Sequence, residues 1–459
     1  MQKRVLIVLA LVVVYRFLAH IPVPLAEPRQ LHDVLDNLLR SSDLGGFINL
    51  LSGGALASLS IVLVGLSPYI TASVITQLLT KAIPRLEELH KDGESGRRKI
   101  QQWTRLITLP LSIMQSIAFI FILRQTILAG NTGVDIIAHT SPLQWVTMVT
   151  AMTAGSMLLM WLGELMTEQG VGNGMSLLIF AGIISQLPKT LGTIVTSVTN
   201  VPTDADKLHV FNWFTLPVNG FALAVTAGLA VVGLLALYLI VKINEAQRII
   251  NISYAKRVQG NRAYGGVTSI LPVKLITAGV IPVIFAVAFL ALPAFVGQLL
   301  RATNNAGWQQ FGNNLVTWFQ TPNQIAFASP TMTTFIYPAM YFLLVVAFTY
   351  FYTSIVFNAN EIAENLQKQG GFLANIRPGQ QTETYLSQVV TRLTLFGSIA
   401  LGIIAILPFA TEYVFAQFGI QAQNLAIGGT GLLIVVSVTL ETLRQINSRA
   451  LMVTYDQDY

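Results

Sequence analysis

The run GLSPYITAS, residues 65–73, lies inside a hydrophobic segment, residues 57–79, that is long enough to cross a lipid bilayer. Gly65 and Pro68 interrupt this segment next to small hydroxyl residues, and a Gly-Gly pair lies just upstream at residues 53–54. In lipid, irregular backbone is tolerated only where protein buries it or where it faces water. We therefore expect the segment to line a cavity, and a broken segment of this kind indicates a transport path near the middle of the membrane.

The composition is typical of a protein with many membrane crossings. Hydrophobic residues make up 53% of the 459 residues, charged residues only 10%, and the mean hydropathy is +0.62. A soluble domain has about 25% charged residues. The chain has no cysteine, which excludes disulfides and thiolate chemistry. Its first apolar stretch runs to Pro22 without a small-residue cleavage site, so we expect a transmembrane helix there and no cleaved signal peptide.

Apolar stretches recur along the whole chain at the length that spans a membrane, which is roughly 20 residues for a ~30 Å hydrocarbon core. Ten such stretches lie at residues 5–22, 57–79, 106–128, 145–166, 175–193, 220–241, 275–299, 334–357, 393–409 and 425–443. The sequence therefore predicts an all-α membrane protein with ten transmembrane helices.

The distribution of basic residues indicates the orientation. With ten crossings both termini lie on one side, and most of the 27 Lys and Arg residues fall on that side. Because short cytoplasmic loops carry an excess of Lys and Arg, both termini are expected in the cytoplasm.

Two of the expected cytoplasmic loops, residues 242–274 and 358–391, are longer than a connection between adjacent helices needs. Their basic residues include Lys256, Arg257 and Arg377. Such loops suit a partner with phosphate groups or an acidic surface, such as ribosomal RNA. The alternative is that the basic residues serve only as topology signals.

The sequence contains few of the residue patterns that catalysis requires. The 5 His residues form no His-x-x-x-His or His-Glu-x-x-His spacing, and no phosphate-binding Gly-x-x-x-x-Gly-Lys-Ser/Thr loop occurs. Glu164 and Glu168, one helical turn apart, fit either a proton relay or residues paired at the cytoplasmic interface. The membrane core is otherwise almost free of ionisable groups, which argues against an ion-coupled transporter of small solutes. We expect no enzyme activity and no cofactor. An ion-coupled secondary transporter and a lipid-scaffold or insertase-like protein remain the alternatives.

Motifs in a specific order extend over nearly the whole chain. They are YR (15–16), IPVP (21–24), GGAL (53–56), PYITAS (68–73), QLLT (77–80), TR (104–105), MWLGE (160–164), GNG (172–174), YAKR (254–257), AGVIPVIF (278–285), FTYFY (348–352), IRPG (376–379) and GGT (428–430). In this order and spacing the chain resembles the SecY family, the large subunit of the bacterial Sec protein-conducting channel.

The resemblance implies two inverted five-helix halves around a central pore. The halves would be residues 1–195 and 215–459, joined by a periplasmic hinge loop at residues 196–214. It also implies a location in the bacterial cytoplasmic membrane and two small membrane subunits, SecE and SecG. Further implied partners are the SecA motor, the ribosome, signal sequences, secretory polypeptides and membrane lipids. Lys256, Arg257 and Arg377 would contact the cytoplasmic partners.

The resemblance also implies site residues. The pore ring would consist of Leu66, Ile70, Met175, Ile179, Ile284 and Ile434, aliphatic side chains that leave a dewetted barrier to ions. The plug would include Phe47, Leu50, Leu51, Gly53, Gly54, Ala55 and Leu56. The lateral gate would include Gln77, Gln115 and Ile276. This chain departs from the family at Leu66 and Met175, where Ile is common, and at Ile276, where Asn is frequent.

Overall fold

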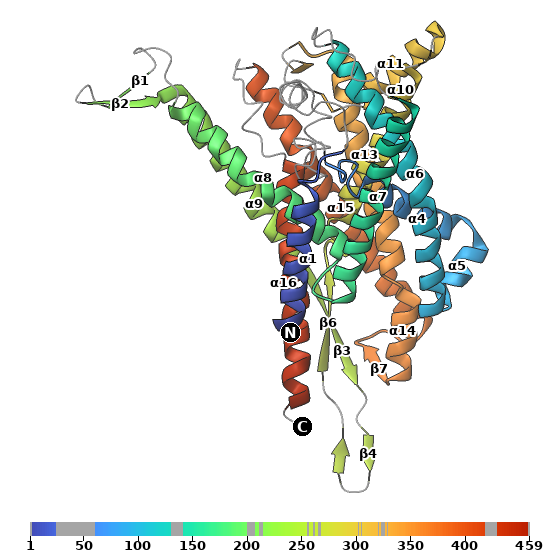
Figure 1. The fold of residues 1–459 in the computed structure, drawn as a ribbon. Helices are drawn as coiled ribbons and strands as arrows, with labels where there is room; N and C mark the ends of the chain where they lie inside the picture. Colours follow the sequence, from blue (N-terminus) through green and yellow to red (C-terminus); the bar gives the residue numbers. More distant parts are fainter. Residues whose placement is uncertain are drawn as a thin grey trace.

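The computed structural model describes residues 2–23, 60–129, 141–199, 207–210, 214–254, 257–259, 262–264, 268–301, 303, 305–319, 321–322, 326–327, 329–417 and 429–457. The fold is built almost entirely from helices (Figure 1). In the first part of the chain these are α1 (Gln2–Leu18), α4 (Ser67–Ala82), α5 (Pro84–Lys91), α6 (Glu94–Ala129), α7 (Pro142–Glu168) and α8 (Gly174–Thr199).

The second part of the chain continues in the same way. Its helices are α9 (Gly220–Glu245), α10 (Ile281–Arg301), α11 (Ala306–Phe319), the 3-10 turn η2 (Met332–Phe335), α13 (Ile336–Val356), α14 (Ala359–Lys368), α15 (Gln380–Gln417) and α16 (Gly429–Gln457). Each of the ten apolar stretches overlaps one of the long helices. Within the described residues, 7 helical segments are long and apolar enough to cross a membrane.

The break expected in the second apolar stretch is present. Residues 61–66 form turns, and α4 begins only at Ser67. Gly65 adopts a φ of +64°, which disfavours a side chain, and Pro68 lies in the first helical turn, where its missing N–H costs no hydrogen bond. With 16 residues, α4 is about 24 Å long and does not span the ~30 Å core by itself.

Short strands occur where the sequence analysis expected only loops. β3 (Gln247–Tyr254) pairs antiparallel with both β6 (Thr268–Lys274) and β7 (Gly371–Leu373), so that one sheet joins the two long basic loops. β4 (Arg257–Gln259) and β5 (Arg262–Tyr264) form a hairpin beyond this sheet, and β1 (Lys207–Val210) pairs with β2 (Phe214–Asn219). Ile250, Ile252 and Leu373 alternate toward a small apolar core with α15, which explains why this sheet forms.

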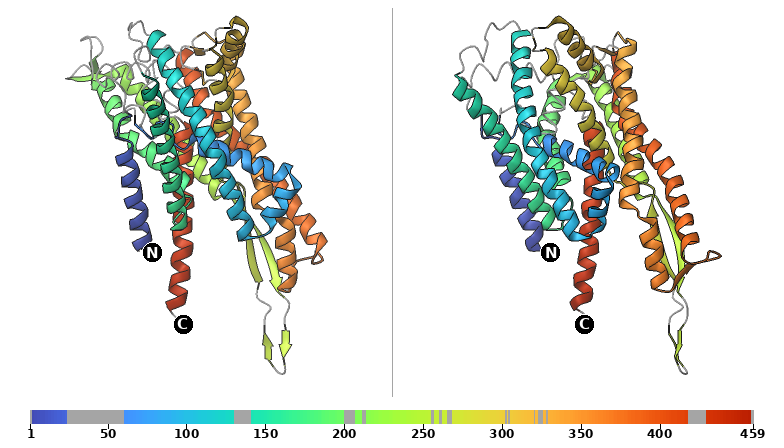
Figure 2. Two further views of the ribbon diagram at one scale, coloured as in Figure 1. Left: turned by 45° about the vertical axis from the view of Figure 1, so that its right-hand side comes forward. Right: turned by 90° about the vertical axis from the view of Figure 1, so that its right-hand side faces the viewer.

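Different secondary-structure elements lie at the two ends of the molecule (Figures 1 and 2). Both termini and the β4–β5 hairpin lie toward one end, whereas β1, β2 and α11 lie at the other. Between them one apolar core is shared by α1, α4, α7, α8, α9, α10, α13, α15 and α16. The core therefore contains helices from both parts of the chain.

Candidate channel site

All six predicted ring residues belong to this shared core. Leu66, Ile70, Ile179, Ile284 and Ile434 are buried members of it, and Met175 is a partly buried residue packed against it. They come from the starts of α4 and α8, the first turn of α10 and the first turns of α16. Their side chains are apolar, with only the weakly accepting sulfur of Met175 among them, and the ring that they would form stays a prediction.

The start of α8 is set by the GNG motif. Asn173 caps the helix, because its Oδ1 accepts hydrogen bonds from the backbone N of Met175 at 3.1 Å and of Ser176 at 3.4 Å. At Gly174 a Cβ would lie only 1.9 Å from the carbonyl oxygen of Gly163, so α8 approaches α7 more closely than any other residue type permits. Met175 follows directly, and its side chain packs against Gly163, because a Cβ added to Gly163 would collide with the Met175 sulfur.

The start of α4 is held by α7. The hydroxyl of Ser156 donates a hydrogen bond of 2.8 Å to the carbonyl of Gly65, and a Cβ on Gly155 would lie 2.1 Å from the carbonyl oxygen of Ile61. These contacts fix the turns that precede α4. Leu66 and Ile70 are therefore positioned by backbone contacts rather than by side-chain fit alone.

The start of α10 is set by the AGVIP motif. Gly279 adopts a φ of +62°, in the left-handed region that favours glycine, and the N–H of Val283 donates to the carbonyl of Val280 at 3.0 Å. Pro282 lies in the first turn of the helix, where a proline is tolerated. Ile284 follows within that turn and is 7% exposed.

Two of the predicted gate residues lie at the seam between α4 and α6. Gln77 of α4 donates from Nε2 to Ser73 Oγ at 3.1 Å, but its Oε1 is buried without a partner. Gln115 of α6 is 1% exposed, and neither of its amide atoms has a hydrogen-bond partner. Buried polar atoms are normally paired, so this seam is an exception that needs a functional reason.

The third predicted gate residue, Ile276, precedes α10 and is buried. It packs against α15, where a Cβ on Gly397 would lie 3.4 Å from its Cγ1. The neighbouring Thr277 donates from Oγ1 to Thr353 Oγ1 of α13 at 3.2 Å. The role of Ile276 in a gate stays a prediction.

Three further polar side chains at the same seam were not singled out from the sequence. Thr71 of α4 and Ser112 and Ser116 of α6 are buried, and their hydroxyls have no hydrogen-bond partner. The signal was available, because Ser112 and Ser116 are one helical turn apart and share a face with Gln115. Small hydroxyl residues are common in membrane helices, which hides such a cluster in the sequence.

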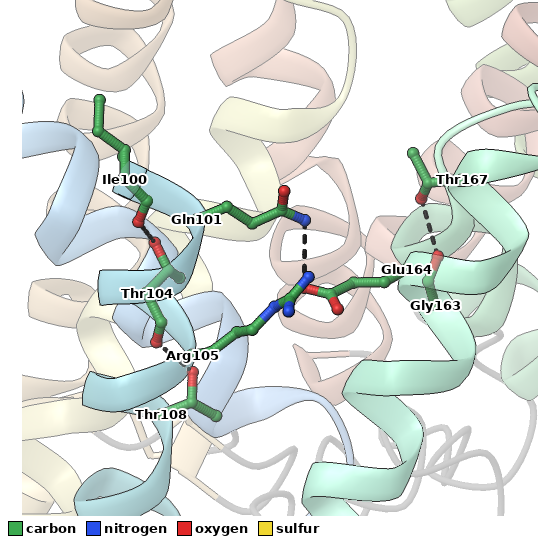
Figure 3. Close-up of polar contacts among 8 residues, drawn as sticks. All are labelled: Ile100, Gln101, Thr104, Arg105, Thr108, Gly163, Glu164 and Thr167. Carbon is green, nitrogen blue, oxygen red and sulfur yellow. Dashed lines mark hydrogen bonds and ion pairs between the residues drawn. The ribbon is translucent and has the colours of Figure 1, made fainter. Parts of the chain in front are cut away.

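The Glu164 carboxylate is paired with two side chains of the helix α6 (Figure 3). Its Oε1 accepts hydrogen bonds from Arg105 Nε at 2.8 Å and from Gln101 Nε2 at 3.1 Å, both on α6. The Glu164 carboxylate is only 8% exposed, so the Arg105 charge compensates its burial. This arrangement favours the interpretation as a structural pair over a proton relay.

The C-terminal part of α16 makes contacts that the sequence analysis missed. Arg444 Nη2 donates to the carbonyl of Asn244 at the end of α9 at 3.2 Å, and Asn244 Nδ2 donates to Ser437 Oγ at 2.8 Å. These two hydrogen bonds join α9 to α16. Burial, followed by the nearby Arg444 guanidinium, lowers the pKa of Lys274 at the end of β6, and the Glu441 carboxylate opposes this shift.

The remaining predicted residues divide into two groups. Arg257 begins β4 opposite Tyr264, and Arg377 lies between β7 and α15, where its carbonyl accepts a 3.0 Å hydrogen bond from Thr382 Oγ1. Lys256 and the plug residues Phe47, Leu50, Leu51, Gly53, Gly54, Ala55 and Leu56 lie outside the described residues. Across the described part of the chain, no group of His, Cys, Asp and Glu suited to a metal ion is found.

The fold and the site together define a polytopic α-helical membrane protein whose two parts share one apolar core, a class that includes protein channels. The sequence profile of the SecY family matches residues 60–443. The chain belongs to the SecY family.

Relatives and solved structures agree with this assignment. The chain is 40% identical to the protein translocase subunit SecY of Streptomyces galbus, over 99% of this chain and 96% of the relative. It is 38% identical to the corresponding subunit of Mycobacterium tuberculosis over the same shares. A solved SecY structure described in work on its plug domain has a TM-score of 0.59 at 19% identity and covers 96% of this chain and 91% of that one. A structure of a protein-conducting channel has a TM-score of 0.56 at 18% identity, with coverages of 95% and 91%. At these identities the two structures show a shared fold.

Proposed function

We propose that this chain is the channel-forming subunit of a bacterial protein translocase. It passes secretory polypeptides across the cytoplasmic membrane and releases hydrophobic segments sideways into the bilayer. One observation carries the proposal: in a member of the SecY family, the six predicted ring residues, from four segments far apart in sequence, all belong to or pack against one buried apolar core. Such a ring yields to a passing chain, because no specific contact has to break, yet it excludes ions by dewetting.

The proposed architecture has ten transmembrane helices in two inverted halves, residues 1–195 and 215–459, with the hinge loop at residues 196–214. It is supported by the helix that overlaps each apolar stretch and by the shared core, to which α4 and α8 of the first half and α10 and α16 of the second contribute. The position of both termini at one end, beside the basic hairpin, supports a cytoplasmic location for that end (Figure 1).

The polar side chains on α4 and α6 belong to the proposed lateral gate, which opens between these two helices of the first half and α10 and α13 of the second. Each buried polar atom without a partner costs about 1–3 kcal/mol, and an opened gate would offer water or a polypeptide backbone as partners. The unpaired atoms of Gln77 and Gln115 therefore lower the stability of the closed state relative to the open state. A hydrophobic signal sequence then needs to supply only a modest free energy to open the gate.

The cytoplasmic sheet is the proposed docking element for the SecA motor and the ribosome, with SecE and SecG as membrane subunits. It holds Arg257 and Arg377 on two loops that β3 and β7 join. Arg pairs with phosphate or carboxylate through two parallel hydrogen bonds, which suits both ribosomal RNA and an acidic protein surface.

Reconstitution tests the proposal directly. The chain is purified with its co-eluting membrane subunits, placed in vesicles and supplied with the SecA motor, ATP and a secretory precursor. Protease-protected precursor inside the vesicles is the expected result, and a precursor without its signal sequence is the control. Uptake of neither precursor, with small-solute uptake that depends on an ion gradient instead, would refute the channel and favour a secondary transporter.

A further inference from the structure

α11 folds back along the end of α10 that lies opposite to both termini (Figure 1). The two helices touch through their backbones, because a Cβ on Gly297 would lie 2.9 Å from the carbonyl oxygen of Gly312. The built Cβ of Gly312 approaches Arg301, whereas that of Gly297 approaches Val316, so the two helices run antiparallel. Since α10 is one of the segments able to span a membrane, α11 returns alongside its last turns.

An exposed aromatic stripe runs along α11. Trp308, Phe311 and Trp318 are 54%, 48% and 39% exposed and lie on one side of the helix, because residues three, seven and ten positions apart share a face. The opposite, polar side carries only uncharged groups, which are Gln309, Gln310, Asn313 and Thr317, while Asn314 flanks the stripe. The helix has no charged residue. Because α11 runs antiparallel to the end of a spanning helix, Trp308 lies beyond the last turn of α10 and Trp318 lies level with earlier turns.

The surface next to the stripe indicates what covers it. On α10, Val296 and Phe289 are 42% and 39% exposed, so this helix, which is long and apolar enough to span a membrane, presents apolar side chains at its surface. The stripe lies on the helix that packs against the end of α10, where Trp side chains are favoured at the membrane boundary. Lipid rather than a water-soluble protein is therefore the occupant that the position of α11 fits.

A cation lies at the same place. Arg301 is the last residue of α10, and its Nε is buried without a hydrogen-bond partner. The adjoining turn is ordered, because Gln309 Nε2 donates to the carbonyl of Thr303 at 2.7 Å and Asn305 Oδ1 accepts from the N–H of Gly307 at 3.1 Å. The Arg301 residue as a whole is only partly buried, and a guanidinium at a membrane boundary matches a phosphate group through its remaining N–H groups.

We propose that the α10–α11 hairpin is a phospholipid-binding site of the outer leaflet. Arg301 binds the lipid phosphate, Trp308 lies near the boundary between headgroups and acyl chains, and Phe311 and Trp318 lie deeper, beside the acyl chains. The site rests on the orientation proposed above, which places this end of α10 on the outside.

The absence of cysteine makes the test direct, because single labels can be attached at chosen positions. Spin labels are placed on Trp318→Cys, in the stripe, and on Asn313→Cys, on the polar side, with the protein in nanodiscs of phosphatidylglycerol. The label at 318 is expected to collide mainly with oxygen, which dissolves in lipid, and the label at 313 mainly with a water-soluble nickel complex. Equal exposure of both labels to the nickel complex would overturn the site.

A second arm tests the phosphate. Adding Arg301→Gln to the Trp318→Cys protein is expected to increase the mobility of the label in phosphatidylglycerol, but not in a digalactosyl lipid that lacks phosphate. No change in phosphatidylglycerol would overturn the role of Arg301. Precursor transport is measured on the same preparations. Normal transport with a water-facing label at 318 refutes the lipid site alone, whereas a lipid-facing label without transport refutes the proposed function alone.

Discussion

Replacing Gln115 with leucine should stabilise the closed gate. Both amide atoms of Gln115 are buried and unpaired at the seam between α4 and α6, and leucine has a similar size without polar atoms. Each unpaired atom costs about 1–3 kcal/mol, and part of that cost is relieved by local adjustment, so we take about 2 kcal/mol for the whole side chain. Because every ~1.4 kcal/mol is a factor of ten, the ratio of closed to open channels should rise roughly 30-fold.

The assay is the initial rate of precursor transport into vesicles, measured for a strongly and a weakly hydrophobic signal sequence. Gln115→Leu should slow the weak precursor far more than the strong one, because only the weak one lacks the free energy to open the stabilised gate. Ser112→Ala and Ser116→Ala each remove one unpaired hydroxyl, so each should have a smaller effect, about 1 kcal/mol or roughly fivefold. If Gln115→Leu transports the weak precursor as well as the wild type does, the unpaired amide does not limit the closed state.

Three further changes test other parts of the site. Replacing Ile70, Ile179 and Ile284 together with asparagine should hydrate the ring, so that ion conductance in planar bilayers rises while precursor transport continues; unchanged conductance would contradict the ring. Arg377→Glu should weaken binding to ribosomes or to the motor, and wild-type binding should fall steeply with salt in co-sedimentation; equal binding by the variant and the wild type would leave the arginine a topology signal. Glu164→Gln leaves Arg105, whose side chain is 44% exposed, without its counter-charge. After allowance for solvent screening, the change should destabilise the contact between α6 and α7 by about 1–2 kcal/mol. We expect a lower midpoint of thermal unfolding, with precursor transport retained.

Hydropathy alone predicted where the helices lie, but not how far they extend. α6 begins at Glu94 and α15 at Gln380, about three turns before the apolar stretches at 106 and 393. These extra turns are polar and pair locally, as Arg98 does with Glu94 at 3.7 Å. A helix that leaves the membrane keeps its backbone hydrogen bonds in water, so its end is set by capping and packing rather than by hydropathy.

The strands could not be predicted from their own residues. β3 and β7 are separated by more than a hundred residues, and β7 contains only Gly371, Phe372 and Leu373. Its pairing depends on α14 and α15, which bring it to β3, and on Leu366 and Leu386, which build the small core beneath the sheet. The partner of Glu164 was missed for a similar reason, because a helical residue 59 positions away supplies the charge.

Some residues of the candidate site were named from the sequence, and others were found only in the structure. The motifs used to predict the ring contain glycine, proline and asparagine residues that the backbone needs beside it, as Gly174 and Gly279 show. Gln77 and Gln115 were predicted from the family resemblance, and the structure shows that both carry buried unpaired atoms. Ser112 and Ser116 were missed because a serine in a membrane helix usually bonds to its own backbone, and only the structure shows that these two do not.

The sheet that joins the two long loops has a mechanical consequence. The hydrogen bonds between β3 and β6 run across the strands from Gln247 paired with Lys274 to Ser253 paired with Thr268. A load applied to the β4–β5 tip along the strands pulls β3 and β6 in the same direction, so the two strands carry it together. It acts in shear on the bonds between β3 and β7, which run from Ile252 paired with Leu373 to Tyr254 paired with Gly371. Beyond β7 the chain continues into α15, a helix of 38 residues that enters the bundle. A push at the tip is thus delivered to the second half of the molecule as a whole.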